Sequence, residues 1–155
     1  MIEAMHELRG HWAAMLGLLI LAALPAFAQH SMSISLSGAA EVPPVSGTGA
    51  GTGLFTVKPD HSISGNIKVS GFSPSVAHIH EGAVGKNGPP IITLNKTASD
   101  NFDVPAATRL TDAQYASYQA GMLYVNVHSN QHPDGEIRGQ LNSSTNTGPP
   151  TKPAY

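Results

Sequence analysis

Residues 123–141 read LYVNVHSNQHPDGEIRGQL and contain the clearest fold signal in the chain. Apolar and polar residues alternate in both halves of this stretch, which is the pattern of two half-buried strands. The Asp134-Gly135 pair between the halves favours a left-handed backbone and a tight reversal. The stretch therefore predicts an antiparallel hairpin with strands at 123–129 and 136–141.

Further short strands are expected before this hairpin, because apolar runs there are bounded by Gly, Pro, Asn and Asp. The expected strands cover residues 32–36, 54–57, 63–69, 76–80 and 91–94. The glycine-rich segment 47–53 is interpreted as a strand connection or a bulged edge. The polar segment 95–105 is expected to be irregular.

One helix is expected, and it begins after Thr111. The Thr111 hydroxyl can accept a bond from the amide of Gln114, whose side chain can reach back, as in a capping box. Gly121 is expected to end the helix. About seven short strands separated by turns predict an all-β, antiparallel β-sandwich with this one short helix on a connection.

Length and composition narrow the function classes. A chain of 155 residues is the size of one domain. Its formal net charge of −2 gives no reason to expect nucleic acid or an anionic membrane as a partner. The chain has no cysteine, so the hydrophobic core or a bound metal must stabilise the fold without disulfides.

The N-terminal segment 1–28 resembles an export signal. An apolar run from Trp12 to Leu24 follows Arg9 and precedes the small-residue cleavage pattern Ala26-Phe27-Ala28. The run is short for a membrane span, which needs about 20 apolar residues. We expect cleavage after Ala28, an extracytoplasmic (periplasmic or secreted) location and no membrane attachment of the mature chain; an uncleaved anchor is the alternative.

The C-terminal segment 143–155 is rich in Ser, Thr, Pro and Gly, and we expect it to be a disordered tail.

Three histidines form the most informative chemical pattern. His78 and His80 lie two apart on a predicted strand, so both imidazoles share one face at a spacing of about 6.6 Å. His128 lies on the polar face of another strand. If these strands are neighbours, the three imidazoles form a copper or zinc site, with nitrogens expected about 3–4 Å apart. The alternative is a set of histidines that are hydrogen-bonded to the backbone and act as scaffold.

Other polar residues are expected to support this site. Asn126 shares the face of His128, and Glu136 shares a face with Arg138 on the last strand. These three side chains can orient an imidazole from behind; a solvated Glu136–Arg138 ion pair is the alternative. His132, in the hairpin loop, is a weaker candidate ligand. No catalytic residue is predicted, because the chain lacks Cys and a Gly-x-Ser-x-Gly elbow.

Several motifs together resemble the CHRD (chordin-type) domain family. The motifs are EVPPV at 41–45, AHIHEG at 77–82 with NGP at 87–89, LT at 110–111, YVNVHS at 124–129 and PDGEIRGQL at 133–141. The resemblance covers about residues 33–142, which places a CHRD domain at 29–142. It implies a bacterial secreted domain, for which the family provides no established biochemical role.

The family's distant similarity to Cu/Zn superoxide dismutase implies an immunoglobulin-like sandwich. In that comparison His78 and His80 resemble the dismutase's His-x-His copper ligands, and His128 resembles its late copper ligand. The zinc ligands, the bridging imidazole and the cysteine pair of the dismutase have no counterpart here, and Arg138 is only a positional match to its substrate-steering arginine. The resemblance therefore implies at most a copper-only site, without rapid dismutation.

The leading prediction is a non-catalytic, exported binding module that holds one copper or zinc ion on His78, His80 and His128. Its expected partners are the metal ion or an extracytoplasmic protein or polymer. Two alternatives stay open: a copper-dependent redox enzyme of the superoxide dismutase type, and a purely structural interaction domain.

Overall fold

The computed structural model describes residues 30–142. The expected signal peptide and C-terminal tail lie outside the described residues.

Within this range the chain forms nine strands, one α-helix and one 3-10 turn. The strands are β1 (His30–Ser37), β2 (Ala50–Val57), β3 (Ile63–Ser70), β4 (Pro74–Glu81), β5 (Pro90–Thr93), β6 (Asn95–Lys96), β7 (Asn101–Asp103), β8 (Leu123–Ser129) and β9 (Ile137–Leu141). The turn η1 covers Gly38–Ala40, and the helix α1 covers Asp112–Gln119. None of the helices in the described part of the chain is long and apolar enough to cross a membrane.

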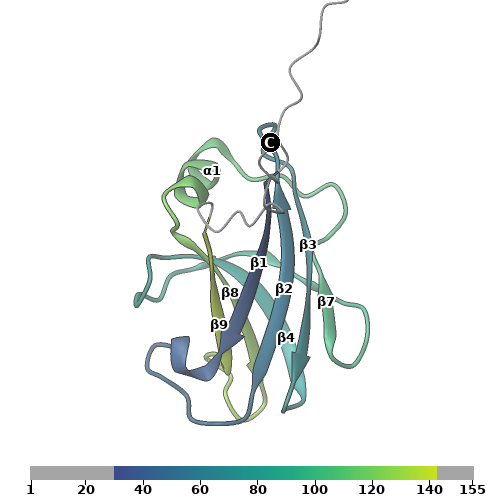
Figure 1. Ribbon diagram of the computed structural model, residues 1–155, viewed down its shortest axis with the longest axis vertical. Helices are drawn as coiled ribbons and strands as arrows, with labels where there is room; N and C mark the ends of the chain where they lie inside the picture. The colour runs from purple at the N-terminus through teal and green to yellow at the C-terminus, as the bar shows by residue number, and fades with distance from the viewer. Residues whose placement is uncertain (1–29, 143–155) are drawn as a thin grey trace, which may run out of the picture.

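All nine strands belong to one antiparallel sheet with the order β5-β4-β8-β9-β1-β2-β3-β7-β6. The sheet folds over on itself, so that β1, β2 and β3 form a layer in front of β4, β8 and β9 (Figure 1). This arrangement confirms the predicted all-β, antiparallel sandwich class with one short helix.

The two ends of the sheet meet in a single segment of chain. β5 pairs with β4 at one end, and β6 pairs with β7 at the other. Between them, the amide of Leu94 donates to the carbonyl of Ala77 at 2.9 Å. The sandwich is therefore a nearly closed barrel, with residues 90–96 as the closing segment.

The core lies between the two layers and is almost entirely aliphatic and aromatic. Phe55, Ile79, Val125, Val127 and Ile137 are completely buried. Each comes from a strand in which every second residue points inward, as the alternation in the sequence predicts.

Two segments differ from the sequence-based expectation. Residues 50–53 belong to β2, because Gly51 and Gly53 face the core where large neighbours fill the space; a Cβ on Gly53 would lie 2.8 Å from Ile67 Cγ2. The segment 95–105 contains β6 and β7, because Phe102 is buried and pairs with Ile67. The glycines of 50–53 and the polar residues of 95–105 lack the apolar alternation that predicts a strand, so the sequence did not indicate either one.

The helix begins and ends as predicted. The Gln114 amide donates to Thr111 Oγ1 at 3.2 Å, and the Thr111 amide donates to Gln114 Oε1 at 2.9 Å. Gly121 follows the helix with φ +70°, a conformation that favours glycine.

Candidate metal centre

The pairing of β4 with β8 assembles the histidine cluster. In this antiparallel register His78 lies opposite Asn126, and His80 lies opposite Tyr124. Residues directly opposite each other share a face, so His128, two positions beyond Asn126, lies diagonally from His78. The two predicted strands are neighbours, and their polar faces coincide.

One ligand nitrogen from each of His78, His80 and His128 lies within 4.8 Å of the others. The closest pair is His78 Nδ1 and His128 Nε2, at 3.0 Å. The ring centroids are 4.9 to 6.0 Å apart. An ion bonded to three nitrogens at about 2.0–2.1 Å requires them to be at most about 4.2 Å apart. The nitrogens lie up to 4.8 Å apart, about 0.6 Å more than this limit. Small rotations of the rings can bring them within it.

Backbone carbonyls orient two of the three rings. His80 Nδ1 lies 2.9 Å from the carbonyl oxygen of Gly88, and His128 Nδ1 lies 2.9 Å from that of Pro133. Because a carbonyl only accepts, each Nδ1 must carry its hydrogen, and each Nε2 then presents a lone pair in the neutral ring. This is the arrangement by which a metal-binding histidine is held in its ligating tautomer.

A layer of flat groups packs behind His80. The Tyr124 ring stacks on the imidazole with centroids 4.9 Å apart and an interplanar angle of 16°. The guanidinium of Arg138 lies 3.5 Å above the centre of the Tyr124 ring, on the neighbouring strand β9. These contacts leave His80 little freedom to rotate.

Arg138 also holds the loop that covers the cluster. Its guanidinium donates to the carbonyls of Lys86 and Ala83, both at 3.0 Å. The loop supplies the Gly88 carbonyl that orients His80. Arg138 is 2% exposed, so this cation is buried against carbonyl oxygens and the Tyr124 ring. Its position supports the site through Tyr124 and the loop, without contacting the ligand nitrogens.

Burial keeps the three imidazoles neutral near pH 7. Desolvation lowers the pKa of each ring. Neighbouring imidazoles lower the pKa of His78 and His80 further, and the charge of Arg138 adds to the effect at His80. A neutral imidazole is the form that binds a metal, so this environment favours ligation over protonation.

Asn126 connects the cluster with a buried carboxyl group. Its Nδ2 donates to Glu41 Oε2 at 3.4 Å, and both side chains are at most 5% exposed. Desolvation raises the pKa of Glu41 to about 7, against the opposing charge of Arg138 and the Asn126 hydrogen bond. The EVPPV segment thus places an ionisable group next to Asn126, the residue that pairs opposite His78.

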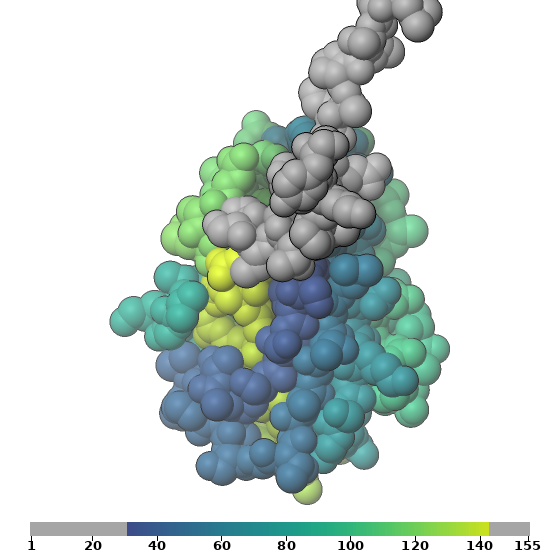
Figure 2. All heavy atoms as spheres, viewed as in Figure 1, coloured from purple at the N-terminus to yellow at the C-terminus, as the bar shows by residue number. Residues whose placement is uncertain are grey.

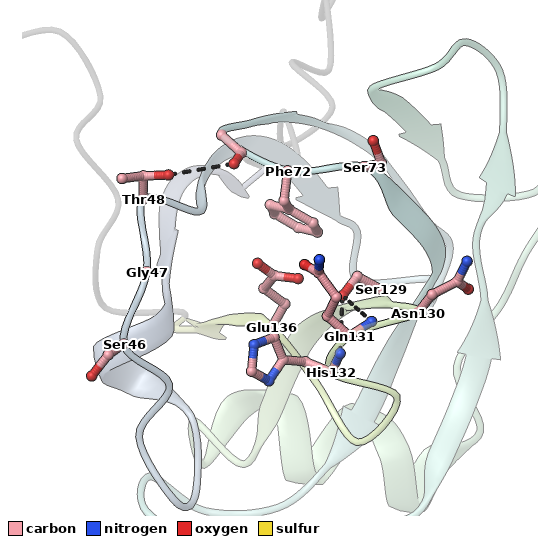
Figure 3. Close-up of a pocket in the computed structure, with 11 residues that line it drawn as sticks. Ser46, Gly47, Thr48, Phe72, Ser73, Ser129, Asn130, Gln131, His132 and Glu136 are labelled. Carbon is pink, nitrogen blue, oxygen red and sulfur yellow. Dashed lines mark hydrogen bonds between the residues drawn. The ribbon is translucent and has the colours of Figure 1, made fainter.

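Glu136 lies apart from the histidine cluster. It lines a pocket at one end of the sandwich together with His132 (Figure 3). Among the described residues its carboxylate forms no ion pair with Arg138 and no hydrogen bond with His78, His80 or His128. His132 is likewise outside the cluster of three.

Some groups that shape the site have weak sequence signals. Tyr124 was identifiable, since it lies two positions before Asn126 on the same strand face. The carbonyls of Gly88 and Pro133 carry no side-chain signal, because any residue offers a carbonyl. Their role depends on how the two loops fold back over the strands.

Comparison with known protein families identifies the family of this chain. The model of the CHRD domain matches residues 32–141, which is most of the chain. The chain belongs to the CHRD domain family. No curated protein and no solved structure matches it. The match to the CHRD domain includes both strands that carry the histidines.

The three histidines of this CHRD domain form a set of nitrogen donors that suits a transition metal. Of the six imidazole nitrogens, His80 Nε2 is buried and has no hydrogen-bond partner among the described residues. A buried nitrogen lone pair without a partner is unfavourable unless something binds it. Three neutral imidazoles suit copper and zinc rather than magnesium or calcium, which prefer oxygen ligands.

Proposed function

We propose that this CHRD domain is an exported binding module that holds one copper or zinc ion on His78, His80 and His128. The unpartnered, buried Nε2 of His80 is the observation that supports the proposal most directly. Backbone carbonyls fix the tautomers of His80 and His128, so the Nε2 of each ring offers a lone pair toward the cluster. Burial lowers the pKa of both rings and keeps them neutral. Copper is favoured on ligand chemistry, because nitrogen sites bind Cu(II) most tightly along the divalent series.

The proposed location outside the cytoplasm depends on the apolar segment before Pro25 and the Ala26-Phe27-Ala28 pattern. Expression of the full chain in a bacterium and mass analysis of the exported protein test this. A mature chain that begins at Gln29 supports the proposal. A full-length chain that stays in the cytoplasmic fraction contradicts it.

A purely structural role for the histidines is the second candidate. The His78–His128 hydrogen bond of 3.0 Å joins β4 to β8, and both carbonyl bonds tie loops to these strands. All three rings therefore already stabilise the fold without an ion. This candidate and the metal site make different predictions for a titration.

The deciding experiment is calorimetric titration of chelator-treated protein with Cu(II) and with Zn(II). We expect one equivalent to bind, and the affinity to fall at least tenfold in His78→Ala and His128→Ala. His78 is the most exposed ring of the three, so His78→Ala is the variant that best preserves the fold. His132→Ala removes an imidazole outside the cluster and should bind metal like the wild type.

Equal affinities in His78→Ala, His128→Ala and His132→Ala would contradict the proposal and favour the structural candidate. For copper-loaded protein, an assay of superoxide decay separates a carrier from a redox enzyme. We expect the copper-loaded protein, freed of unbound Cu(II), to accelerate the decay no more than the metal-free protein does.

A further inference from the structure

A second site lies at the end of the sandwich where the loops after β3, β8 and η1 meet. They enclose a pocket of about 550 Å³, within the size range of small-molecule sites. The pocket does not contain the three clustered histidines, and no function assigned above uses it. Its walls include Thr48, Phe72, Ser73, Asn130, His132 and Glu136.

Figure 3 shows the Glu136 carboxylate in the middle of this ring of loops, directed toward the Phe72 ring. Glu136 is 7% exposed, and its Oε2 has no hydrogen-bond partner among the described residues. A buried carboxylate oxygen without a partner is costly, because it has lost its water and gained no donor. A cationic ligand that pairs with this carboxylate from the pocket side would offset the cost of its burial.

The rest of the wall suits a cation with hydrogens to donate. The Phe72 ring projects into the space opposite the carboxylate, and an aromatic face attracts a cation within about 6 Å. On the rim, the Thr48 hydroxyl donates to the carbonyl of Gly71 at 3.4 Å. The side chains of Ser73 and Asn130 point away from the space, which leaves the carboxylate as its charged acceptor (Figure 3). The wall contains no Lys or Arg. Its Gln131 and His132 side chains can donate, but neither bonds to Glu136 Oε2.

We infer that this pocket binds a primary ammonium group, which pairs with Glu136 and lies against Phe72. An ammonium is preferred over a guanidinium because Oε2 is enclosed by protein, so a ligand in the pocket can approach Glu136 only at Oε1. Guanidinium is best matched by two oxygens in a fork, whereas ammonium is a compact charge with three rotatable donors. The source is a lysine side chain of a polypeptide or a free alkylamine, and both offer the same group.

The test is an NMR titration of uniformly ¹⁵N-labelled protein at pH 7 with four probes. These are N-acetyl-lysine methylamide, its uncharged isostere N-acetyl-norleucine methylamide, N-acetyl-arginine methylamide and n-butylammonium chloride. We expect the lysine probe to shift the amides of Phe72, Asn130 and Glu136 saturably. The norleucine and arginine probes should bind at least tenfold more weakly.

Comparison of the lysine probe with n-butylammonium separates the two sources. Equal affinities identify a free alkylamine as a sufficient ligand, and an affinity at least tenfold higher for the lysine probe identifies a polypeptide. Both results support an ammonium site.

Two variants complete the test. Glu136→Gln keeps the size of the side chain and should weaken the lysine probe at least tenfold. Asp112→Asn removes the same charge from α1, at the other end of the sandwich (Figure 1), and should leave the affinity within twofold. Should Glu136→Gln not fold, the comparison of lysine with norleucine in the wild-type protein decides.

Absence of saturable shifts at these amides would overturn the inference. Equal binding of norleucine, tighter binding of arginine, or unchanged affinity in a folded Glu136→Gln would also overturn it.

Discussion

At the scale of single residues, burial determines how the polar groups of this protein behave. Glu41 and Arg138 are both almost inaccessible to water, yet they have different partners. Arg138 donates to two loop carbonyls and lies over the Tyr124 ring, so its charge is compensated. Glu41 accepts a long bond from Asn126 and interacts with the backbone of Val42, and no cation forms an ion pair with it among the described residues.

Replacement of this carboxyl group should stabilise the protein at high pH. Because the pKa of Glu41 is raised from 4.5 to about 7, the folded state binds its proton more tightly than the unfolded state does. The stabilisation from this group is present below pH 4.5 and is lost as the pH rises through about 7. Glu41→Gln should therefore be more stable than the wild type at pH 8, by roughly 2–3 kcal/mol, and about equal at pH 4.5.

Urea unfolding of both proteins across this pH range measures the difference. A difference that does not change with pH would show that folding does not raise the pKa of Glu41.

Arg138 should be irreplaceable by another cation. Arg138→Lys keeps the charge but cannot bond to both Lys86 and Ala83 while covering the Tyr124 ring. We expect a loss of about 3 kcal/mol of unfolding free energy and faster amide exchange in the loop 83–88. Arg109→Lys is the matched control, since Arg109 forms an exposed pair with Asp60 and should change stability by less than about 0.5 kcal/mol. Equal effects of the two substitutions would contradict this account.

At the scale of elements, loops cover the polar strand faces and remove them from solvent. Every residue of β8 is buried, although the sequence alternates as in a half-exposed strand. The segment 82–89 and the segment after η1 cover the outer face, and Asn87 Nδ2 joins them by donating to the Val42 carbonyl at 2.7 Å. In Figure 2 the blue segment after η1 lies against the yellow surface of β9. These two segments exclude water from the outer face of β8, so the polar side chains on that face are desolvated.

Close contact between strands explains why glycine is required inside β3. A Cβ on Gly65 would lie 2.5 Å from Phe55 Cδ1 and 2.6 Å from the Leu54 carbonyl oxygen. Gly65→Ala should therefore destabilise the fold by about 1–3 kcal/mol. Gly47→Ala, whose Cβ would meet no atom closer than 3.9 Å, should be neutral or slightly stabilising. Thermal unfolding of both variants checks this pair, and equal midpoints would contradict it.

Alternation and turn chemistry predicted most of these elements from the sequence. The hairpin of β8 and β9, the strand with His78 and His80, and the capped helix all lie where local patterns place them. β6 and β7 were missed because their pairing with distant strands, rather than their own residues, makes them strands. The same limit applied to the site: alternation predicted that the histidines share faces, but it could not predict the Gly88 and Pro133 carbonyls or the separate position of Glu136.

At the scale of the whole molecule, the histidine cluster makes stability depend on pH in the direction opposite to Glu41. Burial lowers the pKa of all three imidazoles below 6.5, so the unfolded chain binds these protons more readily. The contribution to stability is present above the unfolded pKa of about 6.5 and is lost as the pH falls below it.

Glu41→Gln isolates this effect, because it removes the opposing group. Metal-free Glu41→Gln protein should lose stability to urea between pH 7.5 and pH 5. Addition of His78→Ala should reduce that loss. An unchanged pH dependence in the double variant would contradict a role for His78 in it.

The closing segment 90–96 has a consequence for how copies of this protein meet. Open sheets expose a row of unpaired amides and carbonyls on which another chain can grow as an added strand. Here both terminal strands are short and belong to one continuous stretch that bridges the sheet's ends. Cross-β assembly of the native protein would first require this segment to detach from the sheet, so the fold itself opposes fibril formation between copies.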